Sequence, residues 1–129
     1  MVGMDWSDEF ATLQALHEQA FEYLVAGRLD ELAPGLRALT VLFTIVGQVD
    51  NGGFRAWIDN SSDGWTEEAI AAARLVGADP HAAVFERFAA GPRDDATLDT
   101  LDEDFYALPS IDGSLTRYVA EHPRDFELR

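Results

Sequence analysis

One segment of the sequence, residues 36–49, is apolar on nearly every side. Only Arg37 and Gln48 in it are strongly polar. A helix that is apolar nearly all round leaves no face for solvent, so other elements must bury it. Its β-branched residues would also suit a strand, but the length of the pattern favours a helix. We therefore predict a central buried helix whose apolar positions are Leu36, Leu39, Leu42, Phe43, Ile45, Val46 and Val49.

Shorter amphipathic patterns flank this segment on both sides. An N-terminal one with apolar residues at helical spacing runs from Phe10 to Leu24. No convincing strand pattern occurs, and 129 residues suit one domain. The sequence therefore predicts an all-α protein, a single compact domain over residues 1–129 with about six or seven short helices around the buried central helix. The later helical patterns cover residues 54–58, 66–76, 79–88, 95–105 and 114–121.

The most distinctive stretch follows the central segment, beginning with Asp50, Asn51, Gly52 and Gly53. Asparagine and glycine tolerate the backbone conformations that end a helix, so we expect a helix stop here. In a structural interpretation, which we favour, the glycines reverse the chain and the residues beyond them pack or cap. In a functional interpretation, Asn51, Gly52, Gly53 and Asn60 line a small-ligand pocket. The motif residues after the glycines are Phe54 and Trp57, which would fill the core, Asn60, which would cap a helix end, and Ser61.

The sequence matches no known motif for catalysis or metal binding. His17, His81 and His122 are far apart, so we expect surface histidines, and without cysteine there is neither a disulfide nor a thiolate ligand. No nucleophile elbow or glycine-rich phosphate loop occurs. The segment Asp59–Gly64 resembles the start of a calcium loop, but its twelfth position is Ile70 where a bidentate glutamate is needed. We predict a protein that is not an enzyme and has no cofactor and no metal site.

Charge is the most unusual property of this sequence. It has 24 acidic and nine basic residues, for a formal net charge of −15, and every basic residue is arginine. Such a surface repels nucleic acid and anionic membranes and attracts basic proteins. The N-terminus lacks the pattern of a signal peptide, and no apolar run is long enough to span a bilayer, so we expect a cytoplasmic protein.

The acids are densest between residues 94 and 104, where six acids and no base occur in eleven residues. On a helix, Asp95, Asp99, Asp102 and Glu103 would share one face, while Leu98 and Leu101 occupy another. An ordinary solvated helix face explains a few such acids equally well, but the absence of any interleaved base favours a binding surface. The predicted partner-binding residues are Asp94, Asp95, Asp99, Asp102, Glu103 and Asp104.

Several of these motifs resemble the signature of the DMP-type DNA-mimic proteins, a bacterial domain family otherwise of unknown function. The resemblance covers about residues 36–126 and departs at Asp50, where asparagine or glutamate is usual, and in a short N-terminal region. It implies an all-helical acidic homodimer whose surface imitates DNA phosphates and occupies the DNA-binding face of a helix-turn-helix regulator. The matching residues are Val49–Phe54, Trp57, Asn60–Ser62, Leu75–Ala78, Leu98, Leu101, Asp102, Phe105, Tyr106 and Tyr118–Phe126.

Charge and resemblance together predict a non-enzymatic acidic DNA mimic that sequesters a basic DNA-binding protein, such as a transcription regulator. Such a protein binds neither nucleic acid nor membrane directly. The same electrostatics also fit an immunity or antitoxin-type protein that caps a basic nuclease. A third hypothesis is a small-ligand-binding domain or enzyme that uses the region from Asn51 to Asn60.

Overall fold

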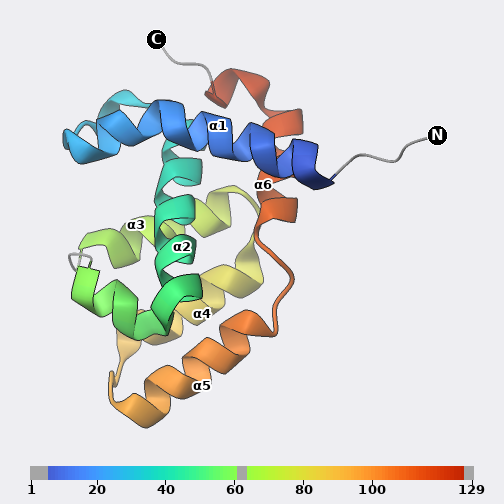
Figure 1. Ribbon diagram of the computed structural model, residues 1–129. Coiled ribbons are helices and arrows are strands. Elements are labelled where there is room, and N and C mark those ends of the chain that lie inside the picture. The colour runs from blue at the N-terminus through green and yellow to red at the C-terminus, as the bar shows by residue number, and fades with distance from the viewer. Residues whose placement is uncertain (1–5, 61–63, 127–129) are drawn as a thin grey trace.

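The structure is a computed structural model that describes the backbone of residues 6–60 and 64–126 and the side chains of residues 11–59 and 65–126. All regular structure in these ranges is helical, which confirms the predicted fold class (Figure 1). The elements are α1 (Trp6–Val25), η1 (Leu29–Glu31), α2 (Pro34–Asn60), α3 (Gly64–Leu75), α4 (Asp79–Ala90), α5 (Asp95–Tyr106), α6 (Asp112–Glu121) and η2 (Pro123–Phe126).

The predicted central helix is the first part of α2. It runs through the middle of the molecule, with α1 across one end and α5 across the other (Figure 1). α2 packs against α1, α3, α5, α6 and η2, so neighbours surround it. Even Thr40 is fully buried there, and its hydroxyl donates to the carbonyl of Leu36 at 2.8 Å. The fully buried apolar side chains of this part are Leu36, Leu39, Val41, Leu42, Ile45 and Val49.

The predicted helix stop is a break inside α2. Gly52 has φ −157° and ψ 20°, and Gly53 has φ 68° and ψ −169°, so neither residue is helical. The combination at Gly53 is a region that only glycine enters readily. A Cβ atom there would also lie 2.9 Å from the carboxyl carbon of Asp102 on α5. Gly53 is therefore required both by the backbone conformation and by the close approach of α5.

A cluster of five aromatic side chains joins the second part of α2 to α4 and α5. The ring centroid of Phe54 lies 5.0 Å from that of Phe88 on α4 and 5.9 Å from that of Phe105 on α5. Trp57 lies 4.8 Å from Phe88 and 5.4 Å from Phe85. All five are buried, so the predicted core role of Phe54 and Trp57 is confirmed. The break turns this aromatic pair toward α4 and α5.

Gly53→Ala tests the break. We expect it to lower the free energy of unfolding by about 1–3 kcal/mol, because alanine is strained at this φ and ψ and its Cβ would collide with the Asp102 carboxylate. Gly47→Ala is the matched control, since Gly47 lies in the helical part of α2 with nothing within 4 Å of an added Cβ. That change should stabilise the protein by about 0.5–1 kcal/mol. Urea unfolding of both variants measures the difference, and equal shifts would contradict the argument.

Candidate partner-binding surface

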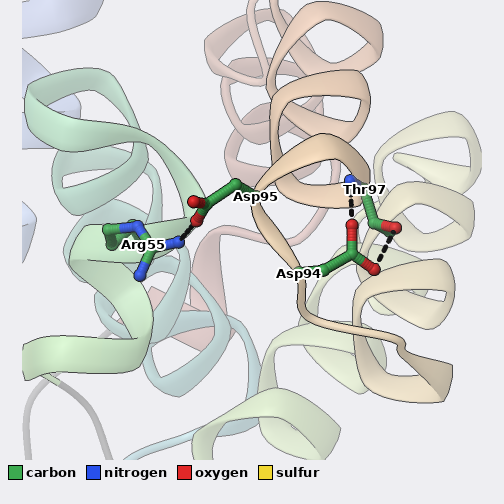
Figure 2. A network of polar contacts seen from close by, with 4 residues as sticks. All are labelled: Arg55, Asp94, Asp95 and Thr97. Atoms are coloured by element: carbon green, nitrogen blue, oxygen red, sulfur yellow. Dashed lines mark hydrogen bonds and ion pairs between the residues drawn. The ribbon is translucent and has the colours of Figure 1, made fainter.

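The acidic segment forms α5 and the residue before it. Asp94 is the N-cap, and its carboxylate accepts hydrogen bonds from the backbone N–H and the hydroxyl of Thr97, both at 2.9 Å (Figure 2). These bonds stabilise the ionised form, so they lower the pKa of Asp94. A carboxylate at this position also interacts favourably with the positive end of the helix dipole. Asp94 therefore has a structural role at the start of α5.

Two other acids of the segment pair with arginines of neighbouring helices. Asp95 forms an ion pair with Arg55 of α2 (Figure 2), and Asp104 lies 2.8 Å from Arg87 of α4. The Asp95 side chain nevertheless remains 87% exposed, so a partner could still reach it. Exposed pairs of this kind contribute little to stability, about 0–1 kcal/mol. They do reduce the local negative charge that α5 presents.

Asp102 faces the break in α2. Its carboxylate accepts a hydrogen bond of 2.8 Å from the backbone N–H of Phe54, the first residue after the glycines. One turn further along α5, the hydroxyl of Tyr106 donates to the carbonyl of Val49, just before the break. Burial, followed by the charges of Asp102 and Asp50, raises the pKa of Tyr106, so its hydroxyl stays protonated as a donor. These two side chains of α5 satisfy backbone groups on both sides of the break.

Asp99 and Glu103 are the remaining acids of the segment. Both side chains are exposed and make no hydrogen bond or ion pair with any residue that the structure describes. Together with Asp95 they occur at intervals of four residues, so they lie along one line on α5. α5 thus divides its acids into two groups. Asp95, Asp99 and Glu103 line the outer face, and of these three only Asp95 has an internal partner, Arg55. Asp94, Asp102 and Asp104 bind groups of this protein.

Outside α5, a second group of acids gathers around the motif residue Asp50. Burial raises the pKa of Asp50, and burial followed by the charge of Asp50 raises the pKa of Asp112 on α6. Ser110, before α6, accepts the N–H of Asp112 at 3.2 Å. No local pattern predicts this arrangement, because Asp50 and Asp112 are 62 positions apart. It places two carboxylates beside the C-terminal end of α5.

The remaining residues of the motif and of the calcium-like segment make no comparable contacts in the described structure. Asn51 is exposed next to the break. The side chain of Asn60 and the whole of Ser61 lie outside the described residues, as does most of the calcium-like segment Asp59–Gly64. Ile70, its twelfth position, packs against the core. Where side chains are described, no group of three potential ligands could hold a metal ion.

The expectation that all three histidines lie at the surface is wrong for His81, which is only 5% exposed. Its Nε2 lies 2.9 Å from the carbonyl of Pro109, and burial lowers the pKa of the ring. Because a carbonyl can only accept, Nε2 carries the proton and Nδ1 is an acceptor. His17 is half-buried between Phe21 and Phe43, and its pKa is also lowered, chiefly by burial. A hydrogen-bond partner distant in sequence allowed His81 to enter the core.

Asp102→Ala and Asp99→Ala separate the structural acid from the outer one. Both positions are inside α5, so the gain in helix propensity on changing to alanine is common to both. We expect Asp102→Ala to lower the free energy of unfolding by about 1–3 kcal/mol relative to Asp99→Ala, because it leaves the N–H of Phe54 without its acceptor. Thermal or urea unfolding measures this difference. Equal free energies of unfolding for the two variants would show that Asp102 does not have this structural role.

Comparison with known proteins places the chain in a family. No described helix is long and apolar enough to cross a membrane. Searches of curated proteins and of solved structures return no match. The family model described as DMP19-like protein matches residues 30–122, close to the region predicted from the motifs. The chain therefore belongs to the family of DMP19-like proteins.

Proposed function

We propose that this protein is a non-enzymatic DNA mimic that binds and sequesters a basic DNA-binding protein, such as a helix-turn-helix transcription regulator. Membership of the DMP19-like family supports a protein of the DNA-mimic type. The observation that carries the proposal is the excess of acids over possible internal partners. With 24 acids and nine bases, fifteen carboxylates remain even if each arginine neutralises one. This excess of negative charge favours a partner rich in arginine and lysine.

The outer face of α5 is the first part of the proposed surface. From Asp95 to Glu103 it spans about 12 Å along the helix axis, since each residue rises about 1.5 Å. Duplex DNA carries about one charge per 1.7 Å, which gives about seven charges over that length. The three outer acids of α5 are fewer than half of these. A mimic of comparable charge density therefore needs further acids beside α5.

Asp50 and Asp112 supply such acids. The charge of Asp50 acts on Tyr106, the last residue of α5, and also on Asp112, so this group lies beside the C-terminal end of the helix. No arginine forms an ion pair with either carboxylate within the described residues. The proposed surface therefore extends from Asp95 along α5 to Asp50 and Asp112. It uses acids from three helices, α2, α5 and α6.

Binding that depends on imitation of DNA should be sensitive to salt and to DNA itself. We expect the tagged full-length protein to recover a basic DNA-binding protein from a lysate of its source organism at low ionic strength. Raising the salt should weaken the complex steeply, because ion pairs with exposed carboxylates are screened. Duplex DNA should release the partner by competition for the same face. Recovery of a nuclease alone would favour an immunity protein instead, and a partner indifferent to DNA would contradict mimicry.

Two double variants with the same change in net charge locate the surface. Asp99→Asn with Glu103→Gln neutralises the unpaired acids of α5, and Glu18→Gln with Glu22→Gln neutralises exposed acids of α1 with the same spacing. α1 and α5 lie across opposite ends of α2 (Figure 1). We expect the α5 variant to weaken partner affinity about tenfold or more and the α1 variant to have a much smaller effect. Calorimetry with the purified partner measures both. Equal losses of affinity in the two variants would mean that binding depends on net charge and not on the acids of α5.

A further inference from the structure

Two adjoining hollows open around Asp50, where α1, α2 and the segment before α6 meet. One has a volume of 220 Å³ and reaches His81 and Tyr106, and the other has a volume of 350 Å³ and reaches His17 and Asp112. Both hollows are lined by Val46, Asp50 and Ser110. Pockets for drug-sized molecules start at about 300 Å³, so hollows of 220 and 350 Å³ suit a smaller ligand, such as a polar group with a short chain.

Several hydrogen-bond donors around these hollows are already used within the protein. The hydroxyl hydrogen of Tyr106 is used by the carbonyl of Val49, and the Nε2 proton of His81 is used by the carbonyl of Pro109. The N–H of Asp112 is used by Ser110. What remains beside the hollows is the carboxylate of Asp50, the carboxylate of Asp112, which is bonded to the side chain of Ser110, and the amide of Gln14. The Asp50 carboxylate accepts no hydrogen bond within the described residues, so a ligand that satisfies it must bring donors.

His81 gives independent support for a missing ligand. Its Nδ1 is buried and has no hydrogen-bond partner within the described residues, although the side chain is only 5% exposed. A buried acceptor without a donor costs about 1–3 kcal/mol, so native proteins rarely leave one unsatisfied. His17 lines the larger hollow, and its Nδ1 is likewise buried without a partner in that part of the chain. His81 lines the smaller hollow and, because its Nε2 carries the proton, offers Nδ1 as an acceptor.

Charge points to the same class of ligand. Asp50 and Asp112 are close enough for one to raise the pKa of the other, and burial raises the pKa of both. A cation between them would offset the repulsion and the lost hydration together. It would therefore return both pKa values toward their usual range, and the affinity for a cation should rise as the pH rises through the titration of these carboxylates.

We propose that the hollows around Asp50 form one binding site for a guanidinium or ammonium group with several N–H donors. Guanidinium suits this geometry well, because its planar fork of donors matches carboxylates in pairs. The group can come from a free small amine or from an arginine of a protein partner. This site goes beyond the proposed function, because its binding of a small cation can be measured in the absence of any DNA-binding protein.

The test uses the full-length protein and NMR signals of the His81 ring and of the Ser110 amide. Agmatine represents a free small molecule, and the blocked peptide acetyl-Gly-Arg-Gly-amide represents a protein-borne arginine. The same peptide with citrulline in place of arginine keeps the shape without the charge. We expect agmatine to shift both signals in a saturable way, with little effect from the citrulline peptide. A shift by the arginine peptide as well assigns the site to protein side chains, and a shift by agmatine alone assigns it to small amines.

Matched variants decide whether Asp50 is the anchor. Asp50→Asn should weaken agmatine binding about tenfold or more, because a charge-assisted hydrogen bond is lost. Asp59→Asn changes the net charge equally at an exposed residue of the same helix and should change the affinity less than about twofold. Asp50 is exposed, so its substitution should leave the fold intact, which unfolding by urea verifies. Unchanged affinity in Asp50→Asn, or no shift with either arginine-like probe, would overturn the proposal.

Discussion

The hydrogen bond from the N–H of Phe54 to the carboxylate of Asp102 connects the acidic helix to the core. The break at Gly52 and Gly53 exposes backbone groups that an unbroken helix would satisfy internally. α5 supplies both substitutes from one face, Asp102 for the N–H after the break and Tyr106 for the carbonyl of Val49 before it. The break in turn directs Phe54 and Trp57 into the aromatic cluster with α4 and α5. Docking of α5 and the bend of α2 therefore depend on each other.

The same helix shows how acids in one run of sequence take on different roles. Asp94 caps its own helix, and Asp102 binds the backbone of α2. Asp95 and Asp104 pair with Arg55 and Arg87, so four of the six acids contact other groups of this protein. The others face outward. Because arginine is the only base in the chain and most acids have none to pair with, the surface carries charge that the fold does not need. The proposals for a basic partner and for a cationic ligand both follow from that excess.

The fold was largely predictable because its strongest constraint is local. Apolar residues on all sides of residues 36–49 require burial wherever the rest of the chain lies, and glycines after Asn51 mark a break. The site was less predictable, because spacing along a helix shows which acids share a face but not what that face meets. Helical spacing groups Asp102 with the outer acids, although it binds an N–H 48 residues away. His81 and the proximity of Asp50 to Asp112 depend on the same kind of distant contact, which has no local pattern.

The separation between Phe54 and Asp102 also orders the assembly of the protein. During synthesis, the second part of α2 emerges well before the residue that caps it, since 48 residues lie between them. Until α5 has been made, the N–H groups after Gly53 must be satisfied by water, and the aromatic pair lacks Phe105 as a neighbour. Closing a loop of this length costs conformational entropy that only later contacts repay. The arrival of the acidic helix therefore completes the bend on which it rests.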